Sequence, residues 1–130
     1  MLKNSKAFSS FSVDDIAKAK DFYVNILGLD VSGEVMGTIN LRLGSGVEVM
    51  MYPKGEAHEP ASFTIITFPV DDIDQAVDML TAEGVNFEQY DNEWMKTNEK
   101  GIARSEDLSQ SPHMAWFTDP AGNILAIMQL

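Results

Sequence analysis

Residues 13–28 read VDDIAKAKDFYVNILG, and residues 70–84 read VDDIDQAVDMLTAEG. The two stretches begin with the same four residues, and both end in glycine. A short segment with strand character precedes each of them, AFSSFSV in the first case and SFTIITFPV in the second. A repeat of this length indicates two copies of one supersecondary unit. The sequence therefore predicts two modules of the same kind.

Each repeat is expected to form a helix, because apolar residues recur at helical spacing over residues 16–27 and 73–80. An aspartate can cap each helix by accepting from free backbone N–H groups. The candidates are Asp14 or Asp15 for the first helix, and Asp71 or Asp72 for the second. Gly28 and Gly84 suit the left-handed residue that follows a helix.

Three segments with strand character follow each helix, separated by glycines and turn formers. They are residues 31–36, 38–43 and 47–52 in the first copy, and 86–95, 112–118 and 124–130 in the second. The order strand, helix and three strands, found twice, predicts an α+β fold of two βαβββ modules. Residues 96–111 are polar and lack periodicity, which predicts a long loop.

The chain is long enough for one domain with its own core, which we expect to span residues 1–130. Module 1 would cover about 1–54, a linker about 55–61, and module 2 about 62–130. There are no cysteines, which excludes disulfides and thiolate metal sites. The net charge of −11 would repel nucleic acid. No signal peptide or membrane-length apolar run is present, so the default expectation is a cytoplasmic protein without a membrane partner.

Two motifs carry a resemblance to a known family. FYVNILG at residues 22–28 and FTDPAGNIL at 117–125, together with the repeat, resemble the glyoxalase/bleomycin-resistance/extradiol-dioxygenase superfamily, also called vicinal oxygen chelate. Residues 99–125 also resemble a subgroup described only as glyoxalase-like. The resemblance implies that the sheets of the two modules curl into a mixed sheet with a cleft, and that the protein forms a homodimer.

The resemblance also identifies positions at which other members of the superfamily bind a metal, one on each of four strands. These positions are Phe8, Met50, Ile65 and Ala126 in this chain. None of these side chains offers the imidazole or carboxylate that a hard divalent cation prefers. A register shift of one residue in either direction does not supply such a ligand. We therefore expect no metal and no cofactor.

Strand alternation predicts which side chains face the cleft. In AFSSFSV, Phe11 and Val13 share the face that packs on a helix, which leaves the opposite parity for the cleft. Applied to the other strands, the same argument predicts one apolar pocket lined by Phe8, Ser10, Glu48, Met50, Tyr52, Ile65, Thr67, Ala126 and Met128. His113, at a strand entrance, is a candidate for the cleft mouth, although a structural role is commoner there.

Some remaining polar and aromatic residues have two interpretations each. Glu48 can anchor a cationic group or act as a base, or it can lie in water at a strand end. Trp94 and Trp116 can stack on a flat ligand, although aromatic residues in strands more often belong to the core. His58 lies in the predicted linker, where a solvated surface role is expected.

Three functions follow from this reading. The first is a metal-free protein that binds a small organic molecule in an apolar cleft, with a cationic ligand favoured by the acidity of the chain. The second is a lyase, isomerase or dioxygenase-like enzyme of the same superfamily that uses Glu48, Tyr52 and His113 for acid/base chemistry. The third is a partner-binding module with a vestigial cleft. The sequence assigns no catalytic residue, because a fold does not determine a function.

Overall fold

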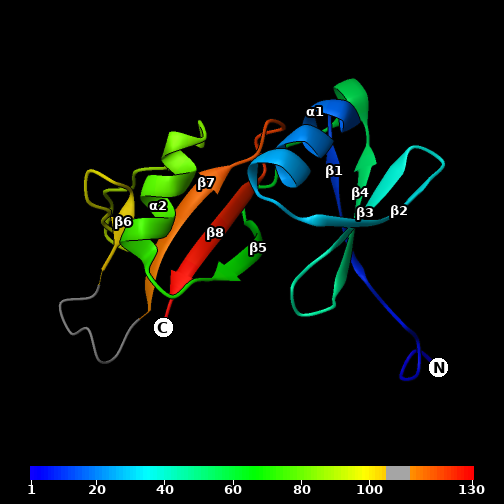
Figure 1. Cartoon of the computed structure of the whole chain (residues 1–130), viewed down its shortest axis with the longest axis horizontal. Coiled ribbons are helices and arrows are strands. Elements are labelled where there is room, and N and C mark those ends of the chain that lie inside the picture. The colour runs from blue at the N-terminus through cyan, green and yellow to red at the C-terminus, as the bar shows by residue number, and fades with distance from the viewer. Residues whose placement is uncertain (105–111) are drawn as a thin grey trace. The chain divides into compact units, whose positions relative to one another are not determined.

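A computed structural model describes residues 1–104 and 112–130 of the chain. The chain divides into two compact units, Met1–Pro60 and Ala61–Leu130, and each has the element order strand, helix and three strands (Figure 1). The α+β class and the predicted repeat are thereby confirmed. Within the described residues, no helix is both long enough and apolar enough to cross a lipid bilayer.

The first unit contains one mixed sheet of four strands. Its strands follow the order β1-β4-β3-β2, in which β1 and β4 are parallel and the other pairs are antiparallel. The helix α1 continues without interruption into a π-helical segment, and a 3-10 turn follows the last strand. The elements are β1 (Ser9–Val13), α1 (Ile16–Lys20), the π-helical segment Asp21–Ile26, β2 (Asp30–Val35), β3 (Thr38–Arg42), β4 (Glu48–Pro53) and the turn Gly55–Ala57.

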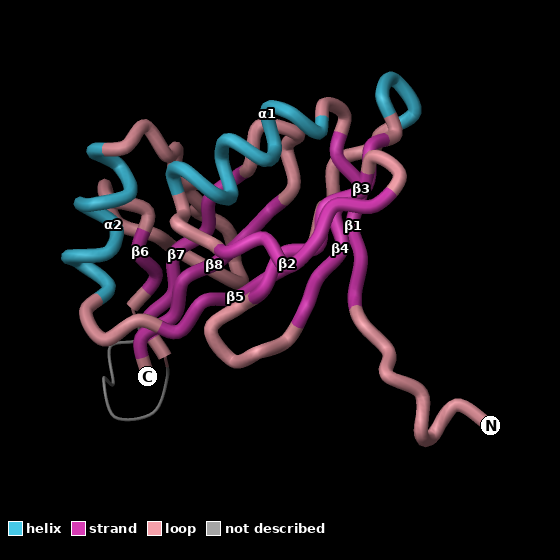
Figure 2. The backbone as a smooth tube through the Cα atoms, turned by 45° about the vertical axis from the view of Figure 1, so that its right-hand side comes forward, coloured by secondary structure: helices cyan, strands magenta, loops and turns pink. Residues whose placement is uncertain are grey.

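The second unit repeats this topology. Its sheet follows the order β5-β8-β7-β6, and again the first and last strands of the module are parallel neighbours (Figure 2). The elements are β5 (Thr64–Pro69), α2 (Ile73–Ala82), β6 (Ile102–Ala103), β7 (His113–Thr118) and β8 (Ile124–Gln129). The identical strand order shows that the sequence repeat is a structural repeat.

Aspartates cap both helices, as the sequence predicts. The carboxylate of Asp15 accepts from the backbone N–H groups of Ala17 and Lys18 at 3.0 and 3.1 Å. The carboxylate of Asp72 accepts from the backbone N–H of Gln75 at 3.0 Å. These bonds satisfy donors that have no partner within the helix, and they fix where each helix begins.

Each sheet buries one face under its own helix. In the first unit, α1 contacts β3 and β4, and Val13, Leu41 and Met51 are fully buried. In the second unit, α2 contacts β7 and β8, and Ile73, Phe117 and Leu125 are almost or fully buried. Because side chains alternate along a strand, residues of the opposite parity occupy the other face of each sheet. We call this surface the helix-free face.

The prediction of a strand at residues 86–95 is wrong. This segment forms only isolated bridges, Phe87 with Phe117 and Asp91 with Lys96. A short strand, β6, lies instead within the segment for which the sequence predicts a long loop. The Asn92 side chain accepts from the backbone N–H groups of Trp94 and Met95 at 2.9 and 3.0 Å, which bends the chain into a tight loop. Residues 105–111 of the predicted loop lie outside the described residues.

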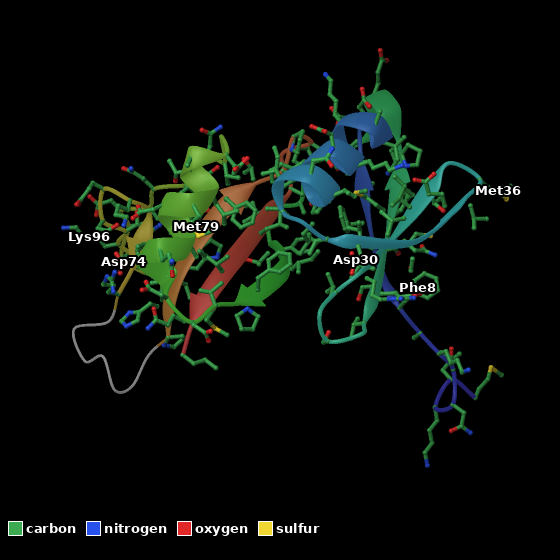
Figure 3. The ribbon with its side chains drawn as sticks, viewed as in Figure 1. Phe8, Asp30, Met36, Asp74, Met79 and Lys96 are labelled. Atoms are coloured by element: carbon green, nitrogen blue, oxygen red, sulfur yellow. The ribbon has the colours of Figure 1, made fainter. Side chains whose placement is uncertain are left out.

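A cluster of ion pairs attaches α2 to residues 100–104. Lys100 lies 2.8 Å from Asp78 and 3.4 Å from Asp74, and Arg104 also bonds Asp74, which faces this segment from α2 (Figure 3). The hydrogen bond from Arg104 lowers the pKa of Asp74, and the hydrogen bond to Asp78 raises the pKa of Lys100. These groups are largely solvated, so their contribution to stability is modest and screened by salt.

The β2–β3 hairpin has an unusual residue at its tip. Met36 and Gly37 form a two-residue loop in which both residues have positive φ, 52° and 81°, the pattern of a type I′ turn. Type I′ turns favour asparagine at the first position, whereas methionine is strained there. The Met36 side chain is 96% exposed and gains no packing that offsets the strain (Figure 3).

Met36→Asn is therefore expected to raise the free energy of unfolding by about 0.5–1 kcal/mol, since asparagine tolerates the left-handed region better. Urea unfolding followed by circular dichroism measures the change. Met36→Ala is the matched control, because it removes the same exposed side chain but keeps the strain, and it should not stabilise the protein. An equal gain from both variants would show that the exposed side chain matters rather than the backbone conformation.

Candidate functional site

The helix-free face of the first unit carries the four predicted cleft residues that lie on its strands. Ser10 pairs with Met50 between β1 and β4, and Ser12 pairs with Tyr52, so these side chains share one face with Glu48. Phe8 precedes β1 with the parity of Ser10, and it is 60% exposed (Figure 3). The predicted strand phase is therefore correct in this unit.

The polar contacts on this face include an ion pair and a side-chain hydrogen bond. Arg42 and Glu48 are opposite each other on β3 and β4, with the guanidinium 3.5 Å from the carboxylate. Ser12 Oγ lies 2.8 Å from His58 Nδ1. His58 is half-buried and hydrogen-bonded, so the solvated role expected for it is wrong. This bond ties the segment after β4 back to β1.

The helix-free face of the second unit carries Thr67, Ala126 and Met128. Thr67 pairs with Ala126 across β5 and β8, and Trp116 of β7 lies opposite Ala126 on the other side. Ala126 has no exposed surface. Met128 lines a separate hollow of about 250 Å³ beside Pro69 and Gln129.

Ile65 departs from the alternation that the sequence predicts. Thr64 pairs with Ile124, but Ile66 pairs with Leu125, so the register shifts and Ile65 is the extra residue of the shift. Such a bulge exchanges the faces of the residues before and after it. Thr64, rather than Ile65, consequently shares a face with Ile124.

His113 lies on the other face of the sheet from these residues. It has the parity of Ala115 and Phe117 on β7, both of which are buried, and it is itself buried. Its Nδ1 atom has no hydrogen-bond partner among the residues that the structure describes. The structure therefore does not bring His113 together with Thr67, Ala126 and Met128.

An aromatic pocket of about 240 Å³ opens on the helix-free face of the second unit. Thr64, Trp116 and Ile124 supply its sheet side, and the loop around Asn92 supplies another side. Trp94 is 88% exposed and Phe63 is 69% exposed. We call this hollow the aromatic pocket; its described lining residues are Ser62, Phe63, Thr64, Tyr90, Asn92, Trp94, Met95, Trp116 and Ile124.

Backbone and side-chain hydrogen bonds fix the loop that forms this pocket. Glu88 N donates to Trp116 O at 2.7 Å, which attaches the start of the loop to β7. Tyr90 N donates to Thr97 Oγ1 at 2.8 Å, and Thr97 N donates to Tyr90 O at 2.9 Å, which closes the loop. The Tyr90 and Trp116 rings meet edge to face, with centroids 5.7 Å apart and planes at 79°.

The Tyr90 phenol is neutral at physiological pH. Burial raises its pKa above the ordinary value of 10.0, and the negative charge of Glu88 raises it further. The phenol can therefore donate a hydrogen bond to a ligand throughout the neutral range.

The sequence indicates only some of the residues of this pocket. Trp94 and Trp116 are recognisable as possible stacking residues, but nothing local in the sequence links them to Phe63 or Tyr90. The link arises from the bulge at Ile65 and from the closed loop at residues 90–97, neither of which follows from periodicity. The sequence does hold one indication of the pocket, which is that Trp94 follows the turn-forming Asn92 by two residues. A tryptophan in a tight turn is exposed rather than part of a strand.

Comparison with known proteins identifies the family of the chain. The sequence profile of the Glyoxalase/Bleomycin resistance protein/Dioxygenase superfamily matches residues 8–127. The chain belongs to this superfamily. No curated protein sequence gives a significant match.

Several solved structures share the fold of this chain at low sequence identity. A glyoxalase family protein from Enterococcus faecalis has a TM-score of 0.71 at 19% identity, covering 98% of this chain and 99% of its own. TnmS3, an antibiotic binding protein from Streptomyces sp. CB03234, has a TM-score of 0.62 at 23% identity, covering 97% of each chain. The fosfomycin resistance protein FosX from Listeria monocytogenes has a TM-score of 0.69 at 13% identity, covering 98% of this chain and 93% of its own.

The residues that the family resemblance places at metal positions do not offer the ligands that a hard divalent cation prefers. Phe8, Ile65 and Ala126 have hydrocarbon side chains, and the Met50 thioether is a soft ligand that hard divalent cations do not select. Within residues 1–104 and 112–130, no three or more His, Cys, Asp or Glu side chains lie together as a possible metal site. The donor chemistry therefore supports no reaction step through a metal at these positions.

Proposed function

We propose that this superfamily member binds a small organic molecule in the aromatic pocket, without a metal. The observation that carries the proposal is the gathering of Phe63, Tyr90, Trp94 and Trp116 around one hollow, with two of the rings largely exposed. Exposed aromatic rings that converge on a concave surface are costly in water and are typical of ligand sites. Ser62, Thr64 and Asn92 supply the few polar groups that orient a ligand.

The names of two proteins with this fold indicate antibiotics as a class of ligand to test. TnmS3 is described as an antibiotic binding protein, and FosX as a fosfomycin resistance protein. Both share the fold of this chain, which makes an antibiotic or a similar small molecule a reasonable class of ligand to test. The hydrocarbon and thioether side chains at the metal positions favour binding over the metal chemistry of other members.

The helix-free face of the first unit is a further candidate surface for ligand contact. Ser10, Met50 and Tyr52 lie there side by side, with the Arg42–Glu48 pair at one end. Glu48 forms an ion pair with Arg42, so the charged pair is better suited to orienting a polar ligand than to proton transfer.

We also propose that the protein forms a homodimer. Sedimentation analysis at micromolar concentrations would distinguish the mass of a dimer from that of a 14.4 kDa monomer.

Trp94→Ala is expected to weaken ligand binding by roughly three- to tenfold, because one aromatic contact contributes on the order of 1 kcal/mol. Ligands come from thermal-shift screening of a metabolite and drug panel, since a ligand of the native state raises the melting temperature. Titration calorimetry then compares the variant with the wild type. The 88% exposure of Trp94 means that the substitution should leave stability nearly unchanged.

Met79→Ala is the matched control, because Met79 is also an exposed apolar residue of the second unit but lies on α2 (Figure 3). It should bind every panel compound as the wild type does. Equal affinity of the Trp94→Ala variant and the wild type for all hits would place binding elsewhere and contradict the proposal.

A further inference from the structure

The aromatic pocket has a corner rather than two parallel walls. The planes of Tyr90 and Trp116 lie at 79° to each other, with the ring centroids 5.7 Å apart. A flat ligand can stack face to face on only one of two perpendicular rings. A compact, rounded group can instead contact both rings at once. The geometry therefore favours a compact apolar group over a flat ring.

The size of the pocket leads to the same conclusion. Its volume of about 240 Å³ lies below the roughly 300–1,000 Å³ of pockets that enclose drug-sized ligands. It is sufficient for one small head group, which the exposed rings of Phe63 and Trp94 could flank. Because every described lining residue is uncharged, no ion pair inside the pocket competes for such a group.

The charge around the pocket is negative. Glu88, Asp91 and Glu93 flank Tyr90 and Trp94 along the chain, whereas residues 88–96 contain one basic residue, Lys96. The negative charge of Glu88 acts on Tyr90, since it contributes to the raised pKa of the phenol. The whole chain carries a net charge of −11. A cation would be attracted to this loop and an anion repelled.

We propose that the aromatic pocket binds an alkylated ammonium group, such as a trimethylammonium head. This inference rests on the proposed function and specifies its ligand class. The faces of aromatic rings carry negative charge, so they attract a cation that hydrogen-bonding groups would hold poorly. A quaternary ammonium has no N–H to donate, and its methyl groups suit an apolar corner of two perpendicular rings.

Choline and its neutral isostere, 3,3-dimethyl-1-butanol, provide the test. They have the same shape and hydroxyl group and differ in the charge of the central atom. Both tryptophans of the chain line the pocket, so their fluorescence reports its occupancy in titrations of the full-length protein. Choline is expected to bind about tenfold more tightly than the isostere, the size of a favourable cation–π contribution.

Two matched carboxylate variants test the electrostatic part. Glu93→Gln, next to Trp94, should weaken choline binding by about twofold to fivefold, and this loss should disappear at 1 M salt, where the Debye length is about 3 Å. Glu83→Gln, an exposed carboxylate at the end of α2, should leave choline binding unchanged. An equal loss from both variants would overturn a local role for the carboxylate.

The outcomes separate this inference from the proposed function. Equal or tighter binding of the neutral isostere would overturn the cation preference but support a ligand pocket at this place. Binding of neither compound would also overturn the inference. The proposed function is tested separately, by comparing the affinities of the Trp94→Ala and Met79→Ala variants for the panel hits.

Discussion

Asp119→Ala is expected to lower the free energy of unfolding of the second unit by about 3–4 kcal/mol, through loss of several buried hydrogen bonds to one carboxylate. Asp119 is 4% exposed. One carboxylate oxygen accepts from the backbone N–H groups of Ala121 and Asn123, both at 2.9 Å, and the other accepts from Asn123 Nδ2 at 3.0 Å. Alanine would leave these donors buried without their acceptor.

The network extends beyond the turn. Asn123 Oδ1 accepts from Ala61 N at 3.0 Å, so the turn between β7 and β8 holds the beginning of the second unit in place. Asp119→Ala frees Asn123 from its orienting partner, and this long-range bond should weaken as well. The FTDPAGNIL motif therefore has a structural role, because its aspartate and asparagine shape the turn between β7 and β8.

Both tryptophans lie in the second unit, so their fluorescence follows the unfolding of that unit in urea. Asp71→Ala is the control, because Asp71 is an exposed aspartate of the same unit, and Asp72, not Asp71, accepts from Gln75 N at the start of α2. It should change stability by less than about 0.5 kcal/mol. A loss of under about 1 kcal/mol for Asp119→Ala would show that the carboxylate is not the centre of the turn.

Gly101→Ala is expected to destabilise the second unit by about 2–4 kcal/mol, which combines backbone strain with a steric clash. Gly101 has a φ of +86°, a conformation that alanine adopts at a cost. A Cβ atom at this position would also lie 2.9 Å from Glu88 O and 2.9 Å from Phe87 Cβ. The backbone oxygen of Glu88 cannot move freely, because Glu88 N is bonded to Trp116 O.

Gly84→Ala separates the two contributions. Gly84 also has a positive φ, +94°, but a Cβ atom there would meet nothing within 4 Å. It should therefore show only the strain, about 1–2 kcal/mol, in the same fluorescence-detected unfolding. If the two variants were equally destabilised, Gly101 would not pack closely against Phe87 and Glu88. Because residues 87–91 lead into the aromatic pocket, Gly101→Ala should also weaken ligand binding.

The fold was predictable because its signals are local and repeated. The stretches VDDIAKAKDFYVNILG and VDDIDQAVDMLTAEG contain the caps Asp15 and Asp72 and the left-handed glycines, with φ of 75° at Gly28 and 94° at Gly84. Alternation in β1 and β4 placed Ser10, Met50 and Tyr52 correctly on the helix-free face. These features depend on neighbouring residues alone.

The candidate site was harder to predict because it depends on irregularities. The bulge at Ile65 moves Thr64 into the aromatic pocket, and alternation cannot foresee an inserted residue. The segment around Trp94 has the composition of a strand, but the Asn92 side chain bends it into a loop. His113 has a definite parity on β7, but its position at the strand entrance alone does not reveal that parity.

The central proposal is that a ligand binds in the aromatic pocket without a metal, and NMR can measure both parts of it. Panel hits would be titrated into ¹⁵N-labelled protein before and after exhaustive treatment with EDTA, and amide chemical shifts would be mapped. We expect the largest shifts to fall on Thr64, Tyr90, Trp94 and Trp116, and the affinity to be the same after EDTA. Binding that is lost with EDTA and restored by zinc or manganese, or shifts confined to other residues, would contradict it.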